Sequence, residues 1–392
     1  MSDVETPGLS PVKACQSIGM VAGEASGDLL GSMLIKALQQ AGHQLDCYGI
    51  AGPKMQACGA RSLYPMETLS VRGYVEALAN IRRILAIRRS LKKRLLADRP
   101  RLFIGMDAPD FNLALEADLK KAGVPTVHFI SPSIWAWRRG RINMIRRAVS
   151  HMLLVFPFEE AIYRDAGIPA TYVGHPLAHA LPERPNRSLA RERLDLRQDA
   201  TYVALLPGSR QSEVDQLASL YLQAAKQLTE ARPEIRFLVP MATRETRLKF
   251  ELAIHEADAM DLPIRIIYGH AHDVLQAADA AIIASGTATL EAALLNCPHI
   301  ITYKVPWLTA QIMKRQAYLP WVGLPNILAG RQIVPELLQE KATPAALAGA
   351  VSDLLANKDE REAMTTAFAS IRTSLRRDTP TLIAGALAPF IA

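Results

Sequence analysis

The amino-acid sequence predicts an α/β protein made of two halves, each with a parallel sheet whose strands alternate with helices. Short apolar runs, read as buried strands, alternate with longer amphipathic stretches from about residue 15 to residue 180. The same alternation begins again at Thr201. Between the halves, residues 181–200 hold two prolines and many charges without apolar periodicity, so we expect a linker and a domain boundary there.

Size and composition are typical of a globular protein. The chain has 392 residues, of which 49% are hydrophobic and 21% are charged, which suggests two or three domains. Its four cysteines include no CxxC pair, so we expect reduced thiols rather than a disulfide framework or a zinc site. The N-terminus lacks a signal-peptide pattern, and no apolar run reaches the ~18 residues of a spanning helix. We therefore expect a cytosolic protein that at most rests on a membrane.

A glycine-rich turn, residues 23–28, connects the first strand (15–22) to a helix from about 29 to 41. It matches neither GxGxxG nor a P-loop, because the Lys-Ser/Thr pair of a P-loop is missing. Glu24 and Asp28 would repel a phosphate at this helix start, whereas two acids with Ser26 suit the hydroxyl groups of a sugar. A tight turn capped by Asp28 is an equally good interpretation of that residue, but it does not explain Glu24.

The basic residues concentrate in residues 81–101, which hold nine Lys/Arg and one acid, a net charge of +8. The whole chain has +7, so the remaining residues sum to −1. Apolar residues recur there at helical spacing and basic residues face elsewhere: Ile84, Ile87, Leu91 and Leu95 against Arg82, Arg83, Arg89, Lys93 and Arg94. Such a helix is typical of a membrane-surface or anion-facing element, while a plain solvated helix and nucleic-acid binding remain open alternatives.

The stretch from residue 101 to residue 112 organises the first half. An apolar strand of residues 101–106 ends at Asp107, and ligands of open α/β sheets bind outside the carboxyl ends of the strands. A carboxylate there can accept a proton from a substrate hydroxyl. Asp110 directly precedes the next helix and suits a helix cap, so we interpret Asp107 as the chemical acid and Asp110 as structural.

Two tryptophans, Trp135 and Trp137, follow the strand of residues 126–130. Residues two apart cannot both join one core face of a helix, and three arginines lie beside them. We therefore expect at least one tryptophan to face solvent, lipid or ligand. Further along, we interpret His175 as a hydrogen-bonded turn residue rather than a substrate contact.

Two strand-to-helix turns in the second half suit an anion. The strand of residues 201–206 leads into small residues with free N–H groups and a guanidinium: Gly208, Ser209 and Arg210. The strand of residues 279–284 leads into a second small-residue turn, with an acid one helical turn later that could bind a ribose diol: Ser285, Gly286, Thr287 and Glu291. Two such turns at one sheet edge predict a diphosphate held between them.

Asn326, on a later loop, can read a base edge with its amide or simply form a turn. No Asp-x-Asp follows an apolar strand, so metal-dependent handling of a diphosphate is not indicated. No Gly-x-Ser-x-Gly elbow or Ser-His-Asp order occurs either. We expect neither a metal nor a cofactor.

Six stretches together resemble the lipid-A-disaccharide synthase family, inverting glycosyltransferases of lipid A assembly in Gram-negative bacteria. They occur in the family's order and span most of the chain from about residue 20 to 340: Gly23-Glu-Ala-Ser-Gly-Asp28, Asp107-Ala-Pro-Asp-Phe-Asn112, Ser131-Pro-Ser-Ile-Trp-Ala-Trp-Arg138, Leu206-Pro-Gly-Ser-Arg210, Ala284-Ser-Gly-Thr287 through Glu291, and Leu324-Pro-Asn-Ile-Leu-Ala-Gly-Arg331.

The resemblance implies the GT-B architecture, two Rossmann-like domains with a substrate cleft between them. Residues 1–185, joined by a C-terminal helix of about residues 365–392, would bind the acceptor, and residues 200–364 the UDP-sugar. UDP-2,3-diacylglucosamine and 2,3-diacylglucosamine 1-phosphate (lipid X) would give the β-1,6 disaccharide 1-phosphate and UDP, with inversion at the anomeric carbon.

The resemblance also implies roles for single residues. Asp107 matches the proposed base that deprotonates the acceptor 6-hydroxyl, and Glu24 matches an acid that the family needs for activity. Arg210 and Asn326 match its nucleotide site. We assign acceptor contacts to four residues of the first half: Ser26, Asp28, Asn112 and Trp137.

Both substrates carry acyl chains, so the basic helix and the tryptophans would act at an anionic membrane surface, on the inner face of the cytoplasmic membrane. A homodimer is one expected assembly. Arg72 stands where the family suggests an apolar residue, and His270 and His272 look individual to this chain. Two alternatives stay open: another UDP-N-acetylglucosamine enzyme, either a 2-epimerase or a MurG-like transferase, and a non-enzymatic protein that binds nucleic acid or membranes through residues 81–101.

Overall fold

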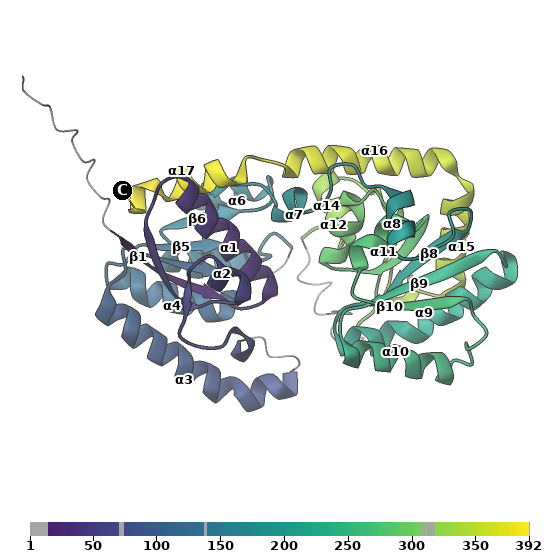
Figure 1. Ribbon diagram of the computed structural model, residues 1–392, viewed down its shortest axis with the longest axis horizontal. Coiled ribbons are helices and arrows are strands. Elements are labelled where there is room, and N and C mark those ends of the chain that lie inside the picture. The colour runs from purple at the N-terminus through teal and green to yellow at the C-terminus, as the bar shows by residue number, and fades with distance from the viewer. Residues whose placement is uncertain (1–14, 70–73, 137–138, 307–309, 312–317, 392) are drawn as a thin grey trace, which may run out of the picture. The chain divides into compact units, whose positions relative to one another are not determined.

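The computed structural model describes residues 15–69, 74–136, 139–306, 310–311 and 318–391 (Figure 1). The chain divides into two compact units. Unit 1 comprises Met1–Ile134, Gly140–Val173 and Asp378–Ala392, and unit 2 comprises Trp135–Arg139 and Gly174–Arg377. The first boundary therefore lies at residue 173 rather than near 185, and the segment that returns to unit 1 begins at Asp378 rather than near 365.

Unit 1 contains a seven-stranded parallel sheet in the order β3-β2-β1-β4-β5-β6-β7. Its strands are β1 (Gln16–Ala22), β2 (Leu45–Ile50), β3 (Arg61–Ser62), β4 (Leu102–Met106), β5 (Thr126–Phe129), β6 (His151–Leu154) and β7 (Ala170–Tyr172). The order reverses between β1 and β4, so the carboxyl ends of these two strands lie at the switch point where open α/β sheets bind ligands.

Helices cover the unit 1 sheet in two layers. On one side α1 packs against α2 and α17, and on the other α4 packs against α3 and α5. The helices of the unit are α1 (Ala25–Gln40), α2 (Pro53–Ala57), α3 (Tyr74–Asp98), α4 (Pro109–Lys121), α5 (Ile142–Ala148), α6 (Glu159–Asp165) and α17 (Thr379–Ile391). Strand β4 is buried along its whole length, because a parallel sheet covered on both faces offers no wet side.

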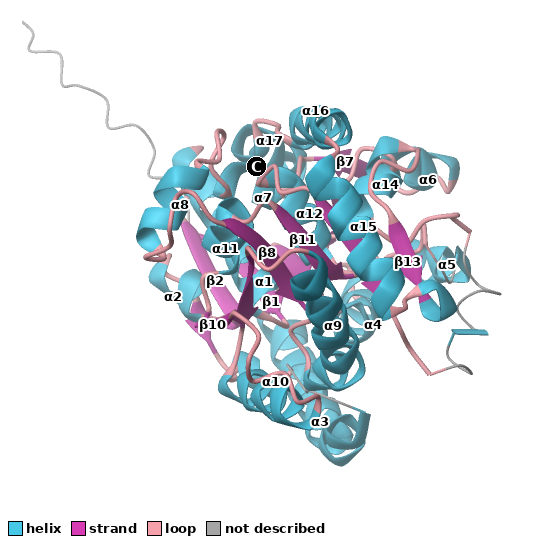
Figure 2. Ribbon diagram, turned by 90° about the vertical axis from the view of Figure 1, so that its right-hand side faces the viewer, coloured by secondary structure: helices cyan, strands magenta, loops and turns pink. Residues whose placement is uncertain are grey.

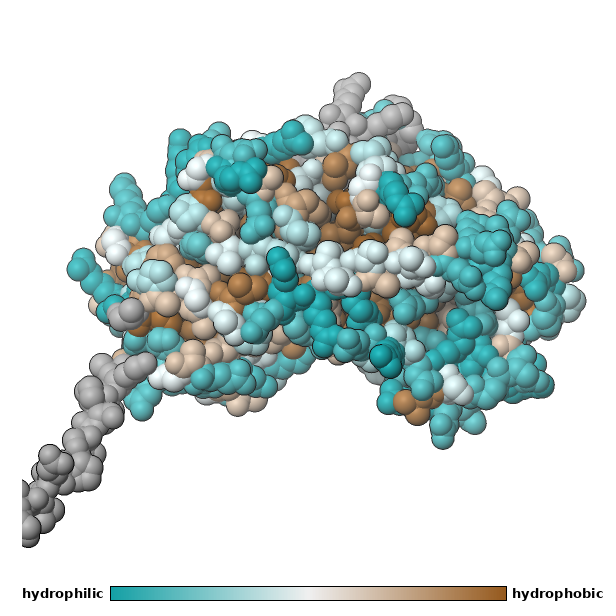
Figure 3. Space-filling view, turned by 90° about the horizontal axis from the view of Figure 1, so that it is seen from above, coloured by the Kyte–Doolittle hydropathy of each residue, from teal (hydrophilic) through white to brown (hydrophobic). Residues whose placement is uncertain are grey.

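The C-terminal helix α17 is an integral part of unit 1. Ile383, Leu387 and Ile391 recur every four residues and are completely buried, while α17 packs along α1. The hydroxyl of Thr379 donates to the carbonyl of Val173 at 2.7 Å and fixes the start of the helix. Seen from above in Figure 3, hydrophilic side chains cover much of this face of the molecule, with apolar residues between them.

Unit 2 contains a six-stranded parallel sheet in the order β10-β9-β8-β11-β12-β13. Its strands are β8 (Thr201–Leu206), β9 (Ile235–Met241), β10 (Ile264–Tyr268), β11 (Ala280–Ala284), β12 (His299–Tyr303) and β13 (Glu336–Leu338). The order reverses between β8 and β11, which places the two predicted anion-binding turns next to each other.

The helices of unit 2 also form two layers (Figure 2). Helices α10 and α15 pack against α9, while α11 packs against α8 and α12. The helices are α7 (Pro176–Ala180), α8 (Arg187–Arg193), α9 (Gln211–Ala231), α10 (Arg244–Glu256), α11 (Ala271–Ala277), α12 (Thr287–Leu294), α14 (Leu324–Ala329), α15 (Pro344–Ala356) and α16 (Lys358–Leu375). In the described part of the chain, no helix combines the length and apolar character needed to cross a membrane.

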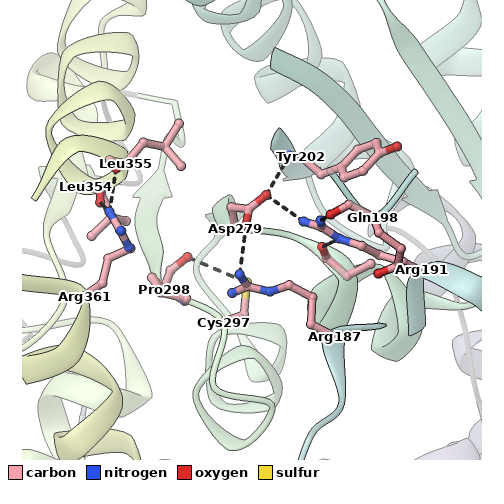
Figure 4. Close-up of polar contacts among 11 residues, drawn as sticks. Arg187, Arg191, Gln198, Tyr202, Asp279, Cys297, Pro298, Leu354, Leu355 and Arg361 are labelled. Atoms are coloured by element: carbon pink, nitrogen blue, oxygen red, sulfur yellow. Dashed lines mark hydrogen bonds and ion pairs between the residues drawn. The ribbon is translucent and has the colours of Figure 1, made fainter. Parts of the chain in front are cut away.

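The predicted linker of residues 181–200 is in fact a packed part of unit 2 (Figure 4). Its helix α8 carries Arg191, whose side chain is 6% exposed and pairs with Asp279 at 2.8 Å. Asp279 also pairs with Arg187 at 2.9 Å and accepts the Tyr202 amide at 2.8 Å. The segment has no apolar periodicity because charged hydrogen bonds, rather than an apolar face, attach it to the sheet.

Candidate functional site

The glycine-rich turn and the Asp107 turn come together in unit 1. Strand β1 pairs with β4 up to Ala22 and Met106, so the segments that follow the two strands are neighbours. A Cβ atom added to Gly23 would lie 2.4 Å from the Cβ of Ala108, so only glycine permits this close approach. Helix α1 begins at Ala25, earlier than predicted, and most of the glycine-rich turn is therefore its first turn.

Asp107 lies in an unusual backbone conformation directly after β4. Its φ is +54° and that of Ala108 is +42°, two consecutive non-glycine residues in the left-handed region. The Asp107 amide donates to Phe129 on β5 at 3.1 Å, and the Asn112 side chain donates to the Asp107 carbonyl at 2.8 Å. Positive φ values at non-glycine residues store backbone strain, which collects at functional sites.

The Asp107 side chain is half-buried. Its carboxylate accepts a long hydrogen bond of 3.4 Å from the exposed hydroxyl of Ser26. Glu24, on the same turn as Ser26, is exposed and occupies the N-cap position of α1 without a side-chain cap hydrogen bond. The turn pair thus presents two carboxylates and a hydroxyl, a set of groups that can hydrogen-bond a polyol.

Two predicted acceptor-binding residues have structural roles instead. Asp28 is 2% exposed, and its two carboxylate oxygens accept the amides of Lys54 and Met55 at 2.9 Å, which caps helix α2. Asn112 is completely buried and holds the Asp107 carbonyl. Both predictions were wrong because a polar side chain at a strand end can equally well satisfy backbone groups.

The remaining predictions for unit 1 and its neighbours have mixed outcomes. Asp110 is exposed in the first turn of α4 and pairs with Arg141, but Ala108, not Asp110, holds the N-cap position. Trp137 lies outside the described residues, as do Arg72 and Arg138, and Trp135 is buried. His175 accepts the Leu177 amide at 3.2 Å at the start of α7, which confirms its turn role.

In unit 2, the first anion-binding turn already contains a carboxylate. Glu213, in the first turn of α9, accepts the amides of Ser209 at 3.0 Å and of Arg210 at 3.1 Å. A Cβ atom on Gly208, whose φ is +127°, would lie 2.3 Å from the Glu213 carboxylate. The sequence predicted these N–H groups to be free, but a capping glutamate three residues later takes them.

The Arg210 side chain itself is exposed. Its guanidinium lies 3.3 Å from Glu213, and its side chain is 77% accessible to solvent. Glu213 therefore does two things at this turn: it fixes the backbone of Ser209 and Arg210, and it contacts one terminal nitrogen of the Arg210 guanidinium. An exposed, pre-oriented guanidinium at a helix start is a suitable ligand for a phosphate.

The second turn of unit 2 is open. Gly286 and Thr287 are exposed at the start of α12, and Ser285 is half-buried with its amide donating to Thr302 at 2.8 Å. The Ser285 hydroxyl donates to the Val322 carbonyl at 3.4 Å, which connects this turn to the segment just before α14, the helix that carries Asn326. The amides at the N-terminus of α12 thus face the same sheet edge as the Arg210 turn.

Glu291 has a partner that the sequence did not predict. Its carboxylate lies 3.1 Å from Nε2 of His272, at the start of α11. The hydrogen bond that His272 donates to the Glu291 carboxylate raises the pKa of His272, against the opposing effect of burial. In the sequence, the pair His270 and His272 was the feature that could have pointed to this contact. The contact of His272 with Glu291, however, depends on how α11 packs beside α12.

Asn326 does not read a ligand. It is completely buried, donates to Val334 and Glu336, and accepts the amides of Ile333 and Val334 at 2.7 and 2.9 Å. All its hydrogen-bonding groups are used to fold the loop after α14, the turn-forming alternative. Among the described residues, no group of three His, Cys, Asp or Glu side chains is arranged to hold a metal ion.

Comparison with known proteins gives a family. The family model described as lipid-A-disaccharide synthetase matches residues 18–384. The chain is 56% identical over 375 residues to the lipid-A-disaccharide synthase of Methylobacillus flagellatus, covering 96% of this chain and 99% of that protein. It is 54% identical over 374 residues to the synthase of Aromatoleum aromaticum, covering 95% and 96%.

Solved structures share the fold at low sequence identity. A UDP-GlcNAc 2-epimerase from Neisseria meningitidis bound to UDP-GlcNAc superposes with a TM-score of 0.62 at 11% identity, covering 96% of this chain and 98% of that one. MurG from Acinetobacter baumannii gives 0.57 at 15%, covering 95% and 99%. The calicheamicin glycosyltransferase CalG4 gives 0.58 at 16%, covering 96% and 98%. These likenesses, with the two parallel sheets, identify the fold as GT-B.

Proposed function

Because this chain belongs to the lipid-A-disaccharide synthase family, we propose that it transfers the sugar of UDP-2,3-diacylglucosamine to 2,3-diacylglucosamine 1-phosphate. The products are the β-1,6 disaccharide 1-phosphate and UDP, and the enzyme is a hexosyltransferase. The observation that carries this proposal is the identity of 56% over nearly the whole length of a named synthase. The epimerase and MurG alternatives rest on 11–15% identity, which shows the fold alone.

Asp107 is the proposed general base. The acceptor 6-hydroxyl oxygen attacks the anomeric carbon, its proton passes to the Asp107 carboxylate, and the bond from that carbon to the UDP oxygen breaks. Attack opposite the leaving group inverts the anomeric configuration. Support comes from the half-buried carboxylate at the β1–β4 switch point and from the restrained backbone that carries it. Glu24 and Ser26 are proposed to hold the acceptor hydroxyls.

Unit 2 is proposed to hold the donor nucleotide. The developing negative charge on UDP is stabilised by the Arg210 guanidinium and by the amides at the N-terminus of α12. Gly208 and Ser209 shape the first turn through Glu213, whereas Ser285, Gly286 and Thr287 approach the diphosphate directly. Glu291 is proposed to accept hydrogen bonds from the ribose diol.

The ribose role of Glu291 predicts a specific loss. Glu291→Ala should weaken UDP binding about 10- to 150-fold, because hydrogen bonds to a charged group contribute about 1.5–3 kcal/mol. Titration calorimetry with UDP and with 2′,3′-dideoxy-UDP measures this: the native protein should prefer UDP, and the variant should bind both alike. Glu251→Ala, which removes a half-buried acid of α10 in the same unit, is the matched control. Unchanged UDP affinity in Glu291→Ala would refute the ribose role.

Helix α3 is proposed to hold the enzyme at an anionic membrane surface, on the inner face of the cytoplasmic membrane. Leu91 and Leu95 are completely buried, whereas four basic side chains are exposed: Arg82, Arg83, Arg89 and Lys93. Within the described residues, none of these four has an ion-pair partner. Ile81, 48% exposed beside them, adds an apolar contact.

Neutralising these four basic residues to glutamine should weaken vesicle binding by up to about 10³-fold, since each contributes about 1 kcal/mol near an anionic surface. Co-sedimentation with vesicles containing anionic lipid measures the change, and vesicles of neutral lipid are the reference. UDP affinity should stay at the native value. Loss of UDP binding, or equal binding to anionic and neutral vesicles by the native protein, would contradict the membrane role. The homodimer stays a prediction, which the mass of the protein in solution would test.

Product analysis tests the function itself. The purified protein is incubated with UDP-2,3-diacylglucosamine and 2,3-diacylglucosamine 1-phosphate, with and without chelator. The products are separated by chromatography and identified by mass spectrometry. We expect equimolar UDP and disaccharide 1-phosphate in both tubes. Epimerised sugar without disaccharide would favour the epimerase alternative, and binding of arbitrary DNA without UDP affinity would favour a nucleic-acid-binding protein.

A further inference from the structure

A buried polar cluster lies beneath the Asp107 turn. Asn112 and Glu116 on α4 and His128 on β5 are each completely buried. A carboxylate oxygen of Glu116, Oε1, lies 2.7 Å from Nδ1 of His128. Burying an acid and an imidazole completely costs desolvation free energy. The contribution of these side chains to packing alone does not explain why they are buried here.

The cluster is joined to Asp107 through Gly105 and Asn112. A Cβ atom added to Gly105 would lie 2.1 Å from Oε1 of Glu116 and 2.9 Å from Cβ of Asn112, so both side chains converge over this glycine. Asn112 and Glu116 are four residues apart on α4 and share one face. Asn112 then donates to the Asp107 carbonyl at 2.8 Å.

The backbone above the cluster is strained on both strands. Asp107 and Ala108 follow β4 with φ of +54° and +42°, and Ile130 follows β5 with φ of +76°. The left-handed region is particularly unfavourable for β-branched residues such as isoleucine. Conformations of this kind persist only where the surroundings over-determine them. The strained segments adjoin the strands that carry Gly105 and His128.

The atoms of the cluster that lack a hydrogen-bond partner indicate which oxygen of Glu116 carries a proton. Within the described residues, Oδ1 of Asn112, Oε2 of Glu116 and Nε2 of His128 have no hydrogen-bond partner. An ionised Glu116 would leave a buried, unpartnered carboxylate oxygen, which is expensive. A proton on Oε2 supplies a donor on the helix face that Asn112 shares, while Nδ1–H of His128 donates to Oε1. Burial raises the pKa of Glu116, and the His128 partner opposes this only in part.

We propose that Glu116 is a neutral carboxylic acid that, with His128, positions the Asp107 base through Asn112. Its protonated oxygen holds the Asn112 amide so that Nδ2 points at the Asp107 carbonyl, and His128 fixes the carboxyl group from β5. None of these residues touches substrate. The inference rests on the proposed role of Asp107 as the base and adds what holds that base in place.

Two substitutions separate a neutral acid from an ionised one. Glu116→Gln keeps the shape and supplies an amide donor in place of the O–H, so kcat should stay within about threefold of the native value. Glu116→Met keeps the approximate volume but removes donor and acceptor, and kcat should fall about 10²-fold, the effect of a misplacement of about 1 Å. KM for the donor and UDP affinity should not change, because the nucleotide turns belong to unit 2.

Thr126→Val is the matched control. Thr126 lies on β5 two residues before His128, is completely buried, and donates to the Ala148 carbonyl at 2.7 Å, at the other end of the strand. Its loss should lower the melting temperature and leave kcat unchanged. A folded Glu116→Met with native kcat, or a Glu116→Gln as inactive as Glu116→Met, would overturn the proposal.

A spectroscopic measurement keeps the proposal testable if Glu116→Met fails to fold. The infrared spectrum of the native protein at neutral pH should contain a carboxylic-acid carbonyl stretch that is missing from Glu116→Gln, and its absence from the native spectrum would refute the neutral acid. Failure of the base assignment gives a different pattern: Asp107→Asn would then turn over normally, whatever the Glu116 variants do.

Discussion

Asp107→Asn is expected to lower turnover about 10²- to 10⁴-fold, the range that a positioned general base contributes. The amide is nearly isosteric with the carboxylate but cannot accept the proton of the acceptor hydroxyl. The turn should keep its shape, because the shorter hydrogen bonds that fix it use the Asp107 backbone amide and carbonyl. The amide oxygen of asparagine can still accept the long bond from the Ser26 hydroxyl. UDP affinity should remain native, so the loss should lie in kcat.

Asp110→Asn provides the matched control for that experiment. The same exchange is made three residues along the same turn, on a side chain that is 82% exposed and paired with Arg141. Surface ion pairs contribute little, so we expect near-native turnover. Steady-state kinetics on the two variants with both diacyl substrates measures the difference. An active Asp107→Asn enzyme would remove the base assignment.

Arg210→Ala should produce the second large effect, a loss of UDP affinity of about 10- to 150-fold. The estimate follows from about 1.5–3 kcal/mol for a hydrogen bond between charged groups, the range appropriate to an exposed side chain. Arg210→Lys should recover only part of the affinity, because lysine keeps the charge but loses the planar fork. Titration calorimetry with UDP gives both values.

Arg247→Ala, which removes an exposed arginine of α10 in the same unit, controls for the loss of one positive charge. UDP affinity of this variant should equal that of the native protein. If Arg210→Ala bound UDP as tightly as the native protein, the phosphate would have to be held by other groups, and the assignment of the first turn would be wrong.

The arrangement of the strand ends could be predicted from the sequence, because it follows from the alternation of apolar strands and amphipathic helices. Buried runs at 101–106, 201–206 and 279–284 alternate with helices, and a doubly wound sheet brings such strand ends to one edge. The pairing of β8 with β11 accordingly placed the Arg210 and Ser285 turns side by side. Asp107 was found for the same reason: it is the first polar residue after an apolar strand.

The direction of individual side chains could not be predicted, since it depends on contacts between distant residues. Asp28 caps a helix that begins 25 residues later, and Asn326 folds its own loop rather than facing a ligand. His128 and Glu116 were not singled out from the sequence, because only the packing of α4 on β5 brings their side chains within 2.7 Å of each other. Polar residues that satisfy backbone groups and polar residues that bind ligands are alike in sequence.

The domain boundary was misplaced for a related reason. The charged, proline-containing segment at 181–200 has the composition of a linker. A largely buried ion pair between Arg191 and Asp279 nevertheless attaches this segment to the rest of unit 2. Composition reports how much apolar surface a segment can bury, not which charges find partners. The return point at Asp378 likewise depends on the apolar face of α17 packing along α1.

Hydrogen–deuterium exchange of the full chain tests the division of labour between the two units most directly. UDP alone should slow exchange in residues 205–214 and 284–295, and 2,3-diacylglucosamine 1-phosphate alone should slow it in residues 20–31 and 103–112. Protection of the Asp107 turn by UDP, or of the Arg210 turn by the acceptor, would contradict the proposal that unit 2 binds the nucleotide and unit 1 supplies the base.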